Sequence, residues 1–212
     1  MRNLAVIAYG GNALLKVGQK GTIDDQELNA YEASKNLIKL IKRGYNLVLT
    51  HGNGPQVGNI LLANTAGHKL YDLPDMPLDI SVAYSQGFIA YILEQQLRNV
   101  LMENDLDSDV ISIITQVLVN KDDPAFLKPN KPIGPYFTKE EAKKFMAESD
   151  SVFKQDKARG GWRKVVASPE PLVIFNMRSI EKIASEGHIA IAVGGGGIPC
   201  YYKQENKLQG ID

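Results

Sequence analysis

Three glycine-rich segments, each placed directly after a short apolar run, constrain the fold of this chain most. The apolar runs are LAVIAY at 4–9, NLVLT at 46–50 and HIAIAV at 188–193, and the segments that follow contain GGN, HGNGPQVG and GGGG. Short runs of β-branched and other apolar residues are typical of buried parallel strands. Ligands of open α/β sheets bind beyond the carboxyl ends of such strands. The sequence therefore predicts a cleft in which glycine amides face an anion, with phosphate as the first hypothesis.

The composition is that of an ordinary globular enzyme. A chain of 212 residues forms one large or two small domains with a substantial core. Its 24 basic and 24 acidic residues cancel, which argues against a nucleic-acid partner or an anionic membrane surface. Cys200 is the single cysteine and forms no internal disulfide. Since we find neither a signal-peptide pattern nor an apolar run near the ~20 residues of a membrane span, we expect a cytoplasmic protein.

Helices and strands alternate along the first half of the chain. Hydrophobic periodicity predicts helices over 24–43, 56–66 and 79–103, the last with Asp79 as N-cap, and a strand over 110–119. This alternation is typical of right-handed crossovers and a parallel sheet. The sequence thus indicates an α/β protein.

The pattern changes at residue 120. The segment 120–171 holds six of the ten prolines and a TKEE sequence, 138–141, that matches a capping box. We interpret 120–171 as a protruding subdomain inserted between an N-terminal α/β lobe, 1–119, and a return to the α/β core over 172–212.

The commonest nucleotide fingerprints are absent from the sequence. GGNALL lacks the GxGxxG spacing, and no segment matches GxxxxGK followed by Ser or Thr. Taken alone, GGN is more often a tight turn than a ligand loop. HGNGPQVG is more specific, because two glycines and a proline that starts a helix place amides at a positive helix end.

Other polar residues are weaker candidates. His51 at a strand end is more often satisfied by a backbone carbonyl, and Cys200 is expected to be a buried, inert thiol. Arg159, Arg163 and Lys164 belong to a basic run, which is usually a solvated face. The histidines and Cys200 share no metal-ligand spacing, so we predict no structural metal.

Together the motifs resemble those of carbamate kinases, members of the amino acid kinase superfamily, from Leu4 to about Gly210. The matching motifs are GGNAL at 10–14, HGNGPQVGN at 51–59, MPLD at 76–79, SQG at 85–87, ITQV at 114–117, KPIGP at 131–135, GWRKVV at 161–166 and GGGGIP at 194–199. KPIGP and GGGGIP separate this family from its relatives.

The resemblance implies an activity, a fold and an assembly. Carbamate kinases transfer a phosphoryl group reversibly between ATP and carbamate, giving ADP and carbamoyl phosphate, with magnesium. They usually supply ATP at the end of arginine fermentation. Their fold is an open three-layer αβα sandwich with a mainly parallel central sheet and a protruding subdomain, to which 120–171 corresponds, and they are homodimers.

The resemblance also implies roles for particular residues. Lys131 of KPIGP is the expected catalytic cation, reaching the transferring phosphoryl group from the subdomain. The residues expected to hold carbamate and that group are Gly10, Gly11, Asn12, Gly52, Asn53 and Gly54. Those expected at the nucleotide phosphates are Gly194, Gly195 and Gly196.

The main departure from the family pattern is at the end of the chain. In the family, GGGGIP leads to an IDKD sequence and then to the last third of the protein, which binds the adenine nucleotide, whereas this sequence ends at QGID. We expect much of the carbamate pocket here without most of the ATP site, and an apolar face left uncovered. Two alternatives stay open: a non-catalytic remnant that binds anions or dimerises, and a related kinase with another acceptor such as acetylglutamate or UMP.

Overall fold

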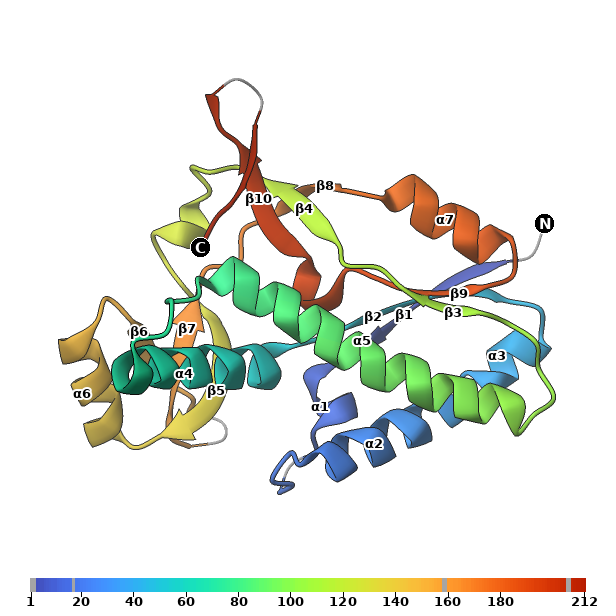
Figure 1. Cartoon of the computed structure of the whole chain (residues 1–212), viewed down its shortest axis with the longest axis horizontal. Coiled ribbons are helices and arrows are strands. Elements are labelled where there is room, and N and C mark those ends of the chain that lie inside the picture. The colour runs from blue at the N-terminus through green and yellow to red at the C-terminus, as the bar shows by residue number, and fades with distance from the viewer. Residues whose placement is uncertain (1–2, 17, 158–159, 205–206) are drawn as a thin grey trace. The chain divides into compact units, whose positions relative to one another are not determined.

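The computed structural model describes residues 3–16, 18–157, 160–204 and 207–212, without the side chains of residues 11 and 12 (Figure 1). The chain divides into two compact units, each built from three segments. Unit 1 comprises Met1–Asn53, Gln86–Gln116 and Ile174–Gly197, and unit 2 comprises Gly54–Ser85, Val117–Val173 and Ile198–Asp212. The predicted boundaries at 119 and 171 stay a prediction.

Unit 1 is built on a parallel sheet. Its strands lie in the order β1-β2-β9-β3, and each neighbouring pair is parallel. Their bounds are Leu4–Tyr9 for β1, Asn46–His51 for β2, Ile189–Ile191 for β9 and Val110–Ser112 for β3. Because the strands are parallel, their carboxyl ends meet at one edge, which is where the glycine-rich segments begin. The predicted α/β fold class is confirmed.

Helices cover both faces of this sheet, because alternate residues of a strand point to opposite sides. Leu47 and Leu49 of β2 pack in one core with the helices α1, α2, α3 and α5, whereas Val48 packs against α7 in a second core. Figure 1 shows α7 on one side of the sheet and α2, α3 and α5 on the other. The helix bounds are Gly11–Leu14 for α1, Ile23–Lys35 for α2, Ile38–Lys42 for α3, Leu78–Met102 for α5 and Met177–Ser185 for α7. Unit 1 is therefore an αβα sandwich.

The long helix predicted over 24–43 is divided in the structure. A capping box between Thr22 and Asp25 starts α2, and α2 ends at Lys35. The amide of Asn36 donates to Ala33 and that of Leu37 to Ser34, so the backbone tightens to i→i−3 bonds before α3 begins.

The strand predicted over 110–119 is also divided, and its halves belong to different sheets. Val110–Ser112 forms β3, whereas Gln116–Val119 forms β4, which lies in a second sheet. The break falls at Thr115, whose hydroxyl donates to the carbonyl of Ile113 at 2.9 Å. Its amide donates to the side chain of Gln86 at 2.8 Å instead of to a neighbouring strand.

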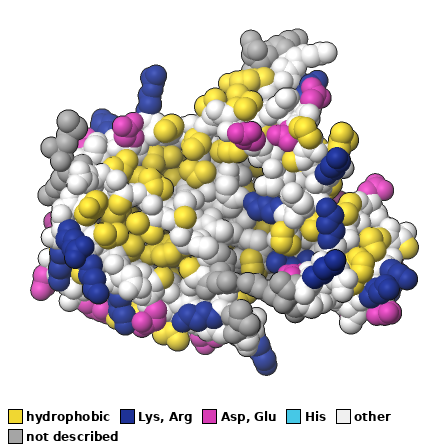
Figure 2. All heavy atoms as spheres, turned by 180° about the vertical axis from the view of Figure 1, so that it is seen from behind, with side chains coloured by type: hydrophobic (Ala, Val, Ile, Leu, Met, Phe, Trp, Pro, Cys, Tyr) yellow, Lys and Arg dark blue, Asp and Glu magenta, His cyan; other side chains and the backbone are white. Residues whose placement is uncertain are grey.

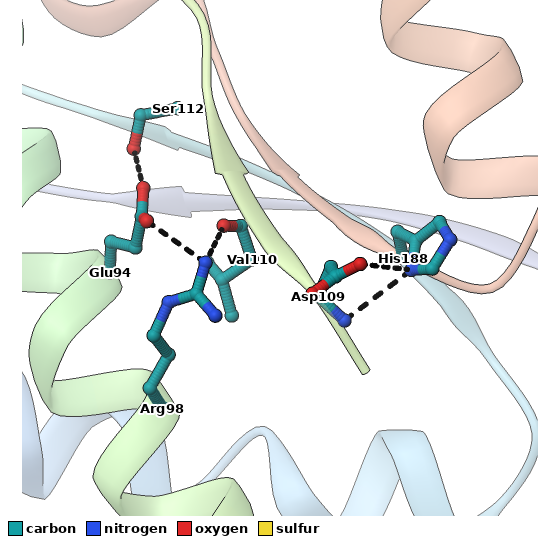
Figure 3. Close-up of polar contacts among 6 residues, drawn as sticks. All are labelled: Glu94, Arg98, Asp109, Val110, Ser112 and His188. Carbon is teal, nitrogen blue, oxygen red and sulfur yellow. Dashed lines mark hydrogen bonds and ion pairs between the residues drawn. The ribbon is translucent and has the colours of Figure 1, made fainter. Parts of the chain in front are cut away.

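The edge strand β3 is tied to α5 by side chains (Figure 3). Arg98 Nη2 donates to the carbonyl of Val110 at 2.7 Å and pairs with Glu94 at 3.1 Å. Glu94 in turn accepts from Ser112 Oγ at 2.6 Å. An edge strand presents unpaired backbone groups, and this arrangement satisfies one of them.

The described residues of unit 2 form two further sheets, the helices α4 and α6, the short 3-10 helix Pro124–Phe126 and the first residues of α5. One sheet has the order β11-β10-β4-β8, and the other, β5-β7-β6, is antiparallel. Thr138 and Glu141 form the predicted capping box at the start of α6. The bounds are Gly54–Tyr71 for α4, Lys131–Phe137 for β5, Lys139–Glu148 for α6, Val152–Gln155 for β6, Trp162–Val166 for β7, Pro171–Ile174 for β8, Ile198–Tyr202 for β10 and Leu208–Gly210 for β11. None of the helices in the described part of the chain combines the length and the apolar character that crossing a bilayer requires.

Candidate functional site

The loops that follow β1 and β2 lie side by side in unit 1. Gly10 directly follows β1 and is the N-cap of α1, with an extended backbone at φ −62° and ψ 161°. The amide of Gly52, directly after β2, donates to the carbonyl of Tyr9 at 2.8 Å, so the parallel pairing continues one residue past the strands. Gly11 lies in α1, and the Asn12 side chain falls outside the part of the chain whose side chains are described.

The GGGG segment packs directly onto His51 and Asn53 within unit 1. A Cβ at Gly194 would overlap the His51 ring, and one at Gly195 would overlap the Asn53 amide. Gly195 and Gly196 also adopt φ values of 68° and 94°, which side chains other than hydrogen rarely permit. Glycine is therefore required here by close approach as well as by backbone conformation. The three predicted loops meet at one edge of the sheet.

A buried glutamine holds the GGGG segment in place. Gln86 of α5 is 2% exposed, and its Nε2 donates to the carbonyls of Gly194 at 2.8 Å and Thr115 at 3.2 Å. Thr115 Oγ1 accepts from the amide of Val193 at 3.1 Å, and Thr50 Oγ1 donates to the Val193 carbonyl at 3.0 Å. SQG and ITQV match family motifs, but the sequence alone assigns no role to Gln86 or Thr115. The signals are the amide side chain of Gln86 next to the apolar stretch GFIAYIL and the hydroxyl of Thr115 within VISIITQVLV.

His51 is neutral and structural at this edge. Its Nδ1 lies 3.1 Å from the carbonyl of Gly52, and because a carbonyl can only accept, Nδ1 carries the proton. Burial lowers the pKa of His51, so the uncharged ring persists at neutral pH. The expectation that a backbone carbonyl satisfies this histidine is confirmed.

In unit 2, the N-terminus of α4 lies beside the strand that carries Lys131. The helix runs 18 residues from Gly54, and the carbonyl of Pro132 is 3.2 Å from the position that a Cβ on Gly54 would occupy. The first turn of α4 contains no acidic residue, so no carboxylate offsets the positive end of the helix dipole there. Burial lowers the pKa of the half-buried Lys131. A helix N-terminus and a lysine side by side favour an anion.

The residues that the sequence indicates as weaker candidates differ in burial and in contacts. Cys200 is buried, its Sγ donates to the carbonyl of Val117 at 3.2 Å, and burial raises the pKa of the thiol, as expected for an inert cysteine. Arg163 is buried, so the expectation of a solvated face is wrong for this residue. Arg159 lies outside the described residues. Across the described residues, no group of three or more His, Cys, Asp or Glu is arranged to hold a metal ion.

These features define an α/β protein with glycine loops at the carboxyl edge of its parallel sheet. The chain is 44% identical to the carbamate kinase of Pyrococcus horikoshii over 212 residues, which are all of this chain and 67% of that protein. It is 43% identical to carbamate kinase 2 of Staphylococcus aureus strain N315, covering 66% of its length. The chain therefore belongs to the carbamate kinase family.

Solved structures agree with this assignment. Carbamate kinase from Giardia lamblia bound to citric acid matches with a TM-score of 0.93 and 40% identity, over all of this chain and 67% of that one. The same enzyme bound to AMP-PNP matches with a TM-score of 0.84. No protein-family model matches the chain. The chain spans about two thirds of the length of these relatives.

Proposed function

We propose that the protein containing this chain transfers a phosphoryl group reversibly between ATP and carbamate, giving ADP and carbamoyl phosphate. Relatives named carbamate kinase support this reaction across the whole chain. The observation that carries the proposal is the packing of Gly194 and Gly195 onto His51 and Asn53, which gathers the glycine loops at one sheet edge. Backbone amides at such an edge suit the oxygens of carbamate and phosphate.

In the forward step, a carbamate oxygen attacks the γ-phosphorus while the bond from phosphorus to the ADP oxygen breaks. This chemistry asks the protein mainly for in-line positioning and for stabilisation of charge on the equatorial oxygens. We assign the positioning to the two N-terminal glycine loops. Their residues are Gly10, Gly11, Asn12, Gly52, Asn53 and Gly54.

Lys131 supplies the cation that faces the transferring group. Burial removes part of the water shell of its ammonium group and thereby lowers its pKa, so a bound anion would stabilise the charged form. A lysine on a flexible four-carbon chain can follow the phosphoryl group as it moves between donor and acceptor. The positive end of α4 beside it acts on the same oxygens.

Magnesium would bind together with the nucleotide. Mg²⁺ is usually held by substrate phosphates with one or two carboxylates rather than by an all-protein cage. Gly194, Gly195 and Gly196 would approach the nucleotide phosphates, and the AMP-PNP complex of the Giardia relative supports the use of a nucleotide. We further propose a cytoplasmic homodimer that makes ATP in arginine catabolism, as the family resemblance implies.

The test is ATP formation from ADP and carbamoyl phosphate by the natural gene product that contains these 212 residues. We expect Lys131→Ala to lower kcat by about 10²-fold or more, because a charge-stabilising donor is lost. Lys128→Ala is the matched control, since Lys128 is an exposed lysine three residues earlier. Absence of turnover, or equal activity of Lys131→Ala and the parent, would contradict the proposal. A panel with acetylglutamate and UMP as acceptors would reveal a related kinase.

A further inference from the structure

Arg163 of β7 is a buried cation in a segment where the sequence predicts a solvated face. It is 8% exposed, and its Nε and Nη2 donate to the carbonyl of Gly134 at 3.2 and 2.9 Å. Its guanidinium also lies 5.2 Å from the centre of the Tyr136 ring. Burying a charged group is costly unless it is hydrogen-bonded, so a specific role for this side chain is expected.

The guanidinium occupies an irregularity in the ladder between β5 and β7. Ile133 pairs with Lys164 and Phe137 with Trp162, so three residues of β5 lie opposite Arg163 alone. Extra residues in one strand leave backbone groups without their regular partners. Two donors from Arg163 satisfy the Gly134 carbonyl at this point, so the side chain takes the place of a strand partner for this one carbonyl.

The same bulge rests on α4 at its other side. Gly134 adopts φ 70°, and a Cβ at Gly58 of α4 would overlap the Gly134 backbone. The helix and the strand thus meet backbone to backbone, which glycine at both positions permits. Gly58 is the last glycine of HGNGPQVG, so the second half of that motif serves contact with KPIGP.

Lys131 begins the strand that this bulge interrupts. It pairs with Val166, and Pro132, its neighbour, lies beside Gly54 at the start of α4. We propose that Arg163 is a positioning residue. By holding the Gly134 carbonyl, it fixes the bulge against α4 and thereby sets the position of Lys131 relative to the helix N-terminus. This inference rests on the proposed function of Lys131.

The experiment uses the natural gene product and the variants Arg163→Met, Arg163→Lys and, for chemical rescue, Arg163→Ala. We expect Arg163→Met to lower kcat by about 10²-fold with little change in KM, because a displacement near 1 Å costs about that much. Arg163→Lys keeps the charge without the paired donors and should lose less. Lys154→Met is the matched control: Lys154 pairs with Arg163 in the sheet and also donates to a carbonyl, that of Pro129 at 2.6 Å, but it is exposed.

A double-mutant cycle separates positioning from general stability. If Arg163 acts through Lys131, Arg163→Met should cause no further loss of kcat in the Lys131→Ala background. Added guanidinium should restore part of the activity of Arg163→Ala. If Arg163→Met does not fold, Arg163→Lys replaces it in the same cycle, and the rescue by guanidinium provides a second measurement.

Two results would overturn the inference while the proposed function stands. One is an active parent and an impaired Lys131→Ala enzyme with Arg163 variants that match Lys154→Met. The other is an additive loss in the cycle. An inactive parent would instead contradict the proposed function itself.

Discussion

His51 shows at the scale of one residue how burial sets a charge state. The ring is held between the carbonyl of Gly52 and the backbone of Gly194, where it is 4% exposed and a positive charge would be buried. Because burial lowers its pKa, the folded protein binds this proton less readily than the unfolded chain, in which histidine titrates near 6.5.

The pH dependence of stability follows from this difference. Above a pH of about 6.5, both states are neutral at His51 and the folded state keeps its full stability. As the pH falls from about 6.5 toward the lower pKa of the folded state, only the unfolded chain gains the proton, so stability decreases; below that pKa the effect is constant. We expect His51→Gln to flatten this decrease.

Urea unfolding of the 212-residue chain between pH values of about 8 and 5 would measure this effect. His68→Gln serves as the control, because His68 is an exposed histidine of α4 that also meets a carbonyl, that of Leu73. Parallel stability curves for the parent and His51→Gln would show that His51 does not carry the dependence.

At the scale of elements, the sequence pattern predicted the features that depend on residues close to one another in the chain. The strands β1 and β2 and the TKEE cap of α6 lie where the sequence indicated, because strand preference and capping depend on residues close in sequence. The break between β3 and β4 was not predictable, since VISIITQVLV is mainly apolar and contains no glycine or proline that would mark a break. It arises from the contact of Thr115 with Gln86, which is 29 residues away in sequence.

The predicted site residues show the same difference between features set by nearby residues and features set by contacts distant in sequence. Glycine after an apolar run indicated a loop at a sheet edge, and the structure brings Gly52, Gly194 and their neighbours together there. What the pattern could not indicate is why the third loop needs glycine, because the His51 and Asn53 side chains that fill its space come from another strand end. The role of Arg163 was missed for the same reason, since burial is a tertiary property.

Gln86 offers a test at the scale of the elements that it joins. Gln86→Glu keeps the shape but replaces the NH2 group, which serves the carbonyls of both Gly194 and Thr115, by a carboxyl oxygen that carries at most one proton. We expect the free energy of unfolding to fall by about 1–3 kcal/mol, because at least one of these two buried acceptors loses its partner. The loss should increase as the pH rises and the new carboxyl ionises in a buried place.

Chemical denaturation at two pH values would measure this change. Gln95→Glu is the control on the same helix, because Gln95 is exposed. Equal unfolding free energies for Gln86→Glu and Gln95→Glu would contradict a role for Gln86 in holding α5, the 113–115 segment and the GGGG segment together.

At the scale of the whole chain, apolar surface is left exposed. The second face of the unit 1 sheet is covered by α7 over β2 and β9, whereas Leu4 and Val6 of β1 are 51% and 65% exposed. Figure 2 shows hydrophobic side chains gathered over part of the face seen from behind. Contiguous exposed apolar surface on a folded chain favours association. The formal net charge of zero at pH 7 adds no repulsion between copies.

We therefore expect the 212-residue chain to bind the dye ANS and to self-associate, and the Leu4→Thr/Val6→Thr variant to do both less. Threonine keeps the strand preference of β1 while it removes apolar surface, so the parallel pairing with β2 should persist. Dye fluorescence and light scattering would measure the two effects, with circular dichroism as a check on folding. Leu127→Thr is the matched control, because Leu127 is 86% exposed in a loop of unit 2. An equal decrease in both variants would show that the face of β1 is not the surface that associates.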